Sequence, residues 1–289
     1  MPRISIGDCN LHVERHGDGF PVLFISGLIG TASYWQDHQL PAFSREFDTV
    51  LYDHRGIGRS DGGRSDGARS DSSRAEVARV SQTIEAMAAD AVALLDALGI
   101  QKAHIVGHAT GAAIAQTIAV DHPKRVGAMV LAAAWMKPDA YLRRLFMLRK
   151  ELLIGLGPTA YVQASNLVLY PPDWIAVNNE ALRGMEAQQV ANFPPIETMA
   201  SRIEALLAFD RSKDLGRIKA PTLVIGSADD MEMPAYYSEA LVRAIPDAEL
   251  KLFPNGGHCF NQVMPREFNQ AVLPFLEAHT AKPKEALAS

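Results

Sequence analysis

A five-residue turn, Gly-His-Ala-Thr-Gly at residues 107–111, is the part of the sequence that most directly indicates chemistry. An apolar stretch at 103–106 leads into it, and a run of small residues typical of a helix follows. In this strand–turn–helix context a G-x-S-x-G motif presents a serine nucleophile, and the small residues are needed because the turn is strained and closely packed. In this chain the central residue is Ala109, whose methyl side chain cannot attack a carbonyl carbon.

A histidine near the C-terminal end is the candidate general base. His258 closes the stretch Pro-Asn-Gly-Gly-His after the last predicted strand, and the glycines leave this loop free to bring an imidazole to the turn. Taken alone, His258 could equally be an ordinary histidine of a surface loop. The turn at 107–111 in the same chain favours the catalytic interpretation.

The acid that would orient this histidine is expected after the predicted strand at 222–225. Two neighbouring carboxylates, Asp229 and Asp230, follow that strand. We favour Asp230, four residues before Pro234, as the group that holds the histidine tautomer and stabilises its cation. Asp229 would then cap a helix or stabilise a turn. The order of turn, acid and histidine along the chain is that of enzymes with a G-x-S-x-G turn.

Backbone N–H groups are the expected donors to the oxyanion that forms when a carbonyl carbon is attacked. The glycine-containing segment 26–30 follows the predicted strand at 22–25, and the turn at 107–111 leads into a helix. The N–H groups of Leu28 and Thr110 are the natural pair of donors at these two places. Segment 26–30 could also be a plain glycine turn, because side-chain identity does not test backbone donors.

Short β-rich stretches alternate with helical patterns along most of the chain, which predicts a mostly parallel sheet with helices on both faces. We expect a hairpin at 4–6 and 11–16, and helices at 84–98 and 110–120. The first of these helices has an apolar stripe with a period of about 3.6 residues and ends at Gly99. Buried strands are expected at 22–25, 49–52, 104–106, 129–131, 222–225 and 250–253.

The segment 137–219 interrupts this alternation. It is rich in helix formers, has no obvious strand and is broken by glycines and prolines, so we expect a helical cap inserted between two strands. Such a cap covers a pocket at the carboxyl edge of the sheet. The predicted organisation is a core of residues 1–136 and 220–280, this cap, and a tail of residues 281–289. Four aromatic residues are candidates to line the pocket and contact substrate: Trp135, Phe146, Tyr170 and Trp174.

Composition limits the partners of this 289-residue chain. Its net charge of −5 provides no broad positive field, which argues against nucleic acid. No apolar run approaches the ~20 residues of a membrane span, and we see neither a signal-peptide core nor the ligand spacing of a zinc site. The two cysteines fit a reducing compartment. We expect a cytoplasmic protein that acts on a small molecule without metal or cofactor, as a monomer or a homodimer.

An Arg-Ser-Asp pattern recurs at five-residue intervals within residues 59–74. The period is too short and too polar for a packed repeat, so we expect a solvated loop. One of its arginines could instead guide an anionic substrate. The aspartate two residues after each arginine largely cancels the local charge, which favours the solvated loop.

Together these landmarks resemble the α/β-hydrolase family over nearly the whole chain. The turn, the Asp230 segment and the Gly-Gly-His ending at His258 are similar to that family's landmarks, although Ser26 stands where many members have histidine. The resemblance implies an α/β-hydrolase fold and hydrolysis of a small ester, lactone or amide. Segment 170–174 and the Gly-Gly-His region look most like the aminoacrylate or carbamate hydrolases of bacterial pyrimidine utilisation, and enol-lactonase type hydrolases share the same landmarks.

Three explanations of the alanine remain. Ala109 could be an engineered replacement of a native serine, which typically removes about a million-fold of rate while leaving binding intact. It could be natural in a hydrolase whose His258 and Asp230 activate water directly. The chain could also be a small-molecule binding protein without activity. A protein that had lost its activity has no reason to retain base, acid and oxyanion turn together, so we rank the replaced serine first, the natural alanine second and the binding protein third.

Overall fold

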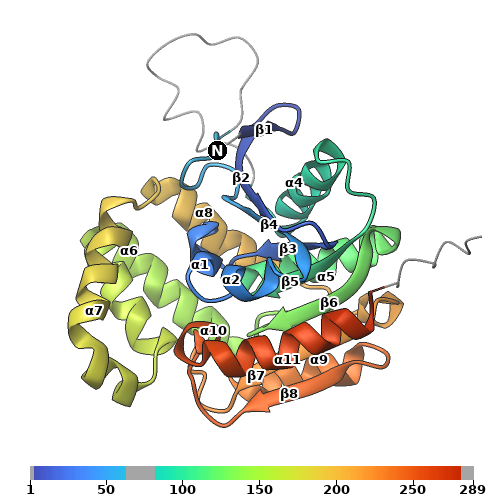
Figure 1. Ribbon diagram of the computed structural model, residues 1–289. Helices are drawn as coiled ribbons and strands as arrows, with labels where there is room; N and C mark the ends of the chain where they lie inside the picture. Colours follow the sequence, from blue (N-terminus) through green and yellow to red (C-terminus); the bar gives the residue numbers. More distant parts are fainter. Residues whose placement is uncertain (1–2, 63–81, 281–289) are drawn as a thin grey trace, which may run out of the picture.

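The structure is a computed structural model that describes residues 3–62 and 82–280 of the chain. The predicted tail at 281–289 and most of the Arg-Ser-Asp segment at 59–74 lie outside the described residues. Eight strands form a single mixed sheet at the centre of the molecule, with helices packed around it (Figure 1). The strands are β1 (Arg3–Ser5), β2 (Asn10–His16), β3 (Phe20–Ile25), β4 (Phe47–Tyr52), β5 (Ala103–His108), β6 (Val126–Ala132), β7 (Thr222–Ser227) and β8 (Glu249–Phe253).

The order of strands across the sheet is β1-β2-β4-β3-β5-β6-β7-β8. β2 is antiparallel to both of its neighbours, and the strands from β4 to β8 are parallel. The predicted hairpin and mostly parallel sheet are therefore confirmed. β8 differs from the expectation of a buried strand, because it lies at the edge of the sheet and leaves Leu250 and Leu252 exposed.

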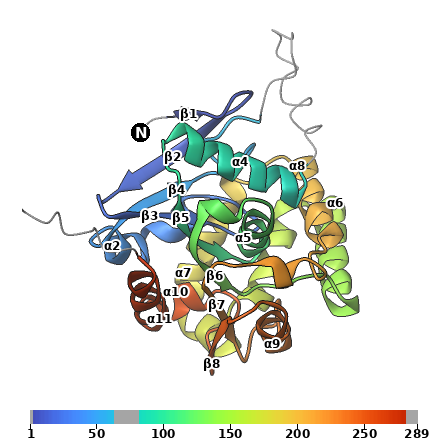
Figure 2. The same cartoon turned by 90° about the vertical axis from the view of Figure 1, so that its right-hand side faces the viewer.

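Helices cover both faces of the sheet (Figure 2). α4 (Ile84–Ala97) and α5 (Thr110–Asp121) pack together on one face, and α11 (Pro265–Ala278) lies on the other. Thr83 caps the start of α4, the predicted apolar stripe is buried, and Gly99 takes a φ of 71° just beyond its end. The shorter helices of the core are α1 (Ser33–Gln36), α2 (Leu40–Phe43), α9 (Ala235–Ala244) and α10 (Phe260–Val263).

Three helices between β6 and β7 form a group that we call the cap helices: α6 (Ala140–Leu169), α7 (Pro172–Ala191) and α8 (Ile196–Ala208). They lie together on one side of the molecule, and α6 packs against both of the others (Figure 1). α6 is bent at Gly157, which has a φ of 83° and precedes a proline. Residues 137–219 are thus helical as expected, and the division of the chain into core and cap stays a prediction.

Helix α6 is long and apolar enough, by length and composition alone, to cross a membrane. Its most apolar 18-residue window has a mean hydropathy of 1.3, although polar residues interrupt the apolar ones along the helix. One such helix is weak evidence for a membrane span. Here the bend at Gly157 and the packing against α7 and α8 account for α6 as a cap helix.

Candidate active site

The turn at 107–111 has the strained geometry expected of a nucleophile elbow. Between β5 and α5, Ala109 has a φ of 49° and a ψ of −116°. A Cβ atom at Gly107 would lie 2.4 Å from the backbone oxygen of Gly111, so these glycines are required for strand and helix to approach this closely. The fold therefore holds an alanine in a backbone region that favours glycine, at the position where a nucleophile would stand.

The imidazole of His258 is buried next to the carboxylate of Asp230. Its Nδ1 lies 3.0 Å from Oδ2 and 3.3 Å from Oδ1 of Asp230. Asp230 Oδ1 also accepts the backbone N–H groups of Glu232 and Met233, each at 2.8 Å. A carboxylate beside Nδ1 keeps the proton on that nitrogen and leaves Nε2 for proton transfer. His258 and Ala109 both line the same cavity.

Asp229, the neighbouring aspartate, holds the loop that carries the histidine. Its carboxylate accepts the Ser227 hydroxyl at 2.5 Å, the N–H of Gly257 at 2.9 Å and the N–H of Gly256 at 3.2 Å. Both glycines have positive φ values, 121° for Gly256 and 64° for Gly257. The structure thus places the Asp229 carboxylate against the glycine loop and the Asp230 carboxylate against the imidazole, and the catalytic role of Asp230 stays a prediction.

A second carboxylate, which the sequence analysis did not identify, lies on the other side of the imidazole. Glu232 Oε1 is 3.4 Å from His258 Nε2, and Glu232 is itself paired with Arg149 of α6. Arg149 also donates to the Ser165 hydroxyl at 3.0 Å and to the Tyr161 hydroxyl at 3.1 Å. The sequence run Asp-Asp-Met-Glu after β7 could have indicated that Glu232 belongs to the site. Its ion-pair partner Arg149 could not be found in this way, because it lies 83 positions from Glu232 in the chain.

The charges around His258 favour its protonated ring. Burial lowers the pKa of His258, but the carboxylates of Asp230 and Glu232 raise it, and the resulting pKa lies above the ordinary value. The ring of His108 lies 4.8 Å from that of His258, and burial together with His258 lowers the pKa of His108 to about 3. His108 is therefore neutral near pH 7, and its Nε2 lies 3.0 Å from the backbone oxygen of His258.

The expected oxyanion turn lies beside the elbow. A Cβ atom at Gly27 would be 3.4 Å from Cβ of Ala109, and Leu28 lines the cavity. The Leu28 carbonyl oxygen accepts a 2.8 Å hydrogen bond from Nε of Arg202, a buried residue of α8, so a cap helix helps to hold this turn. Thr110 is buried at the start of α5. The assignment of the Leu28 and Thr110 N–H groups as oxyanion donors stays a prediction.

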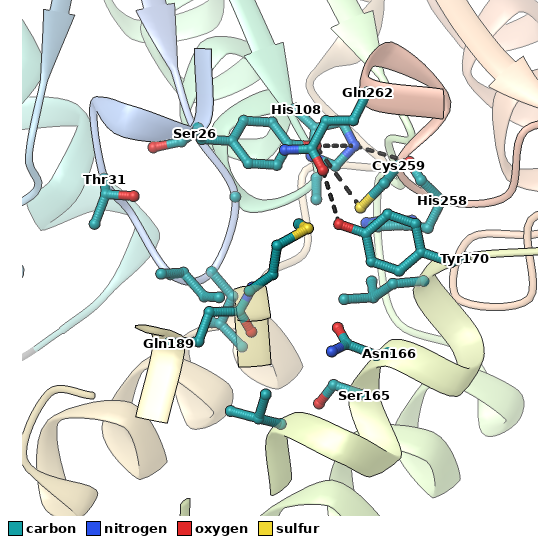
Figure 3. Close-up of a pocket in the computed structure, with 18 of the residues that line it drawn as sticks. Ser26, Thr31, His108, Ser165, Asn166, Tyr170, Gln189, His258, Cys259 and Gln262 are labelled. Carbon is teal, nitrogen blue, oxygen red and sulfur yellow. Dashed lines mark hydrogen bonds between the residues drawn. The ribbon is translucent and has the colours of Figure 1, made fainter. Parts of the chain in front are cut away.

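A cavity of about 540 Å³ lies between the elbow and the cap helices (Figure 3). Tyr170 and Trp174, two of the four predicted aromatic residues, line it and stack with ring centroids 4.6 Å apart. Polar side chains also line it, and Figure 3 shows several of them, namely Ser165, Asn166, Gln189 and Gln262. The wall is therefore mixed in polarity, which suits a small substrate that carries both hydrogen-bonding and apolar groups.

The other two predicted aromatic residues are not among those that line this cavity. Trp135 is buried in the core against Phe209, three residues after the buried end of β6. Phe146 is buried, and Cζ of Arg149 lies 4.6 Å from the centroid of the Phe146 ring. Across the described ranges 3–62 and 82–280, no group of three or more His, Cys, Asp or Glu side chains could hold a metal ion.

Comparison with known proteins identifies the family. A profile described as "Alpha/beta hydrolase family" matches residues 22–271. The chain belongs to the α/β hydrolase family. Several relatives that bear the name "Putative carbamate hydrolase RutD" are similar to this α/β hydrolase over almost its full length. The one from Azorhizobium caulinodans is 42% identical over 275 residues, which is 95% of this chain and 98% of the relative. The one from Pseudomonas savastanoi pv. phaseolicola is 40% identical, over 93% of this chain and 98% of the relative.

Solved structures support the same fold. The enol-lactonase from Burkholderia xenovorans matches this α/β hydrolase with a TM-score of 0.80 at 23% identity, over 96% of this chain and 100% of the other. At that identity the match shows the fold alone. Both resemblances that the sequence suggested, to carbamate hydrolases and to enol-lactonases, are thereby confirmed as similarities. The roles of the individual site residues stay predictions.

Proposed function

We propose that this α/β hydrolase cleaves a small carbamate, with a water molecule as the nucleophile and His258 as its base. The observation that carries the proposal is the buried His258–Asp230 pair, which lies on the same cavity as Ala109. The relatives named carbamate hydrolase, one of them 42% identical to this chain, support carbamates as the substrate class. Small esters, lactones and amides are the related acyl compounds.

In the proposed reaction, His258 Nε2 removes a proton from water while the water oxygen attacks the carbonyl carbon. The N–H groups of Leu28 and Thr110 hydrogen-bond to the oxyanion that forms. When the tetrahedral intermediate collapses, the bond to the leaving amine or alkoxide breaks, and the leaving group takes the proton from His258. Asp230 keeps the Nδ1 tautomer throughout and stabilises the imidazolium. One water is consumed and no covalent intermediate forms.

The position of Glu232 favours water over a missing serine hydroxyl. In a serine triad, Nε2 of the histidine is reserved for the nucleophile. Here a carboxylate lies 3.4 Å from that atom. A second carboxylate suits a base that must remove a proton from water. We therefore now place the natural alanine before the replaced serine as the explanation of Ala109.

Replacement of Ala109 by serine separates these two explanations. If water is the nucleophile, Ala109→Ser is not expected to increase turnover of methyl carbamate or phenyl carbamate, measured by release of the alcohol. The new hydroxyl is still expected to react with a fluorophosphonate probe, because His258 can accept its proton. Intact-mass spectrometry would detect one phosphonyl adduct.

The unmodified protein is the matched control, because it retains the cavity residues Ser26, Ser33 and Ser165 and should remain unlabelled. A rise in turnover of about a million-fold in the serine variant would show that Ala109 replaces a native nucleophile. A serine variant that neither labels nor hydrolyses any activated ester would contradict the assignment of His258 and Asp230. Failure of the unmodified protein to hydrolyse any small carbamate, ester or lactone would contradict the proposed function.

A further inference from the structure

Glu232 and Asp230 are fixed relative to one another by a single tight turn after β7. Asp230 Oδ1 accepts the backbone N–H of Glu232 at 2.8 Å, and both side chains are buried. Asp230 faces Nδ1 of His258 at 3.0 Å, and Glu232 faces Nε2 at 3.4 Å. Each nitrogen of the buried imidazole therefore lies next to a carboxylate.

The contact of His258 with Asp230 is shorter than its contact with Glu232, and only the shorter one is a hydrogen bond. The Nδ1 contact has the length of a hydrogen bond, whereas 3.4 Å at Nε2 exceeds the usual range of about 2.7–3.2 Å for N–H···O. Glu232 thus leaves Nε2 available to another partner while its negative charge acts at close range. Because Glu232 also lines the cavity, that partner can be a water molecule or a substrate atom.

Arg149 is the ion-pair partner of Glu232 in this buried place. The two side chains form an ion pair with only 7% and 5% of their side-chain surface exposed, and the guanidinium also lies over the rings of Phe146 and Tyr161. Since Arg149 belongs to α6, a cap helix supplies the ion-pair partner of the carboxylate next to His258.

We propose that Glu232, held by Arg149, is a positioning residue whose carboxylate stabilises the imidazolium that forms when His258 removes a proton from water. This inference rests on the proposed function. Water is a weak acid, so a more basic imidazole favours its deprotonation. Three charged groups shift the pKa of His258, namely Asp230 and Glu232 from the turn after β7 and Arg149 from α6, while His108 of β5 lies beside the ring and has its own pKa lowered to about 3. The guanidinium of Arg149 lowers the pKa of His258, but the two carboxylates raise it, and the pKa lies above the ordinary value.

The test is Glu232→Gln, which retains the shape of the side chain and removes its charge. The raised pKa of His258 should fall by about one unit or more, measured by NMR titration of the labelled imidazole. A histidine base is active when neutral, so the acid limb of the kcat/KM profile should move to lower pH by the same amount. The rate on the plateau should fall roughly tenfold, because the base is weaker. A purely structural role would lower activity without moving the limb.

Two further variants control the experiment. Glu204→Gln removes the charge of an exposed glutamate that pairs with Lys150, the residue after Arg149, and should leave both the pKa of His258 and the profile unchanged. Glu232→Asp retains the charge and should retain most of the raised pKa, even if the glutamine variant folds poorly.

Two results would overturn the inference: an unchanged pKa of His258 in Glu232→Gln, or a lowered pKa with an unmoved limb and an unchanged plateau. If neither form hydrolyses any carbamate, ester or lactone, the proposed function fails. The NMR titration then still decides whether Glu232 stabilises the imidazolium, so the two failures are distinguishable.

Discussion

Replacement of His258 by alanine is expected to lower kcat/KM for a small carbamate by about 10²–10⁴-fold, the usual contribution of a positioned general base. The physical reason is that Nε2 of His258 is the proposed proton acceptor next to the cavity, and Asp230 is hydrogen-bonded to the other ring nitrogen. Without the imidazole, a water molecule that attacks the substrate would have no base to accept its proton. Steady-state kinetics with methyl carbamate would measure the loss.

The matched control is His122→Ala, which removes an exposed histidine at the end of α5 and should leave kcat/KM unchanged. A melting curve for each variant separates loss of chemistry from loss of fold, because burial of His258 means that its removal also affects packing. Full turnover by a folded His258→Ala protein would remove this residue from the mechanism.

The second large effect is expected at the elbow itself. A Cβ atom at Gly111 would lie 2.0 Å from the backbone oxygen of Ile25 and 2.8 Å from that of Ser26. Both contacts are with backbone of β3 and the adjoining turn, which cannot move as a flexible side chain can. Gly111→Ala should therefore destabilise the fold by about 3 kcal/mol or more, at the upper end of overpacking effects. The unfolding midpoint in urea would report the loss.

Gly155→Ala provides the contrast. Gly155 is an exposed position within α6, and a Cβ atom there would meet nothing within 4 Å. Because alanine favours helix over glycine by roughly 1 kcal/mol, this variant should be as stable as the unmodified protein or slightly more stable. Equal stability of Gly111→Ala and Gly155→Ala would contradict the packing of the elbow described above.

The strands and helices around the elbow could be predicted because their signals are local. Continuous apolar stretches indicate buried parallel strands, and the stripe at 84–98 indicates a helix with one buried face. The small residues at 107–111 indicate a tight turn between a strand and a helix, because only such a turn requires small residues at several neighbouring positions. The burial of β8 was predicted less well, since an edge strand has the same local apolar pattern as a central one.

The wall of the cavity could not be predicted in the same way. In the sequence, Trp135 and Phe146 were aromatic candidates of the same kind as Tyr170 and Trp174. Only Tyr170 and Trp174 line the cavity. Which side of α6 faces inward depends on its bend at Gly157 and on its packing against α7 and α8. The periodicity of a single helix predicts neither its bend nor its packing against other helices.

By itself, the sequence determined the family, the elbow with its alanine, and the pair of His258 and Asp230 as candidates for proton transfer. Only the tertiary structure decided that Glu232 faces the second nitrogen of that histidine and that Arg149 neutralises it. The physical reason is distance along the chain. Motif residues are recognised from their neighbours in sequence, whereas the charge on a buried imidazole depends on groups that the packing of a cap helix brings together in space.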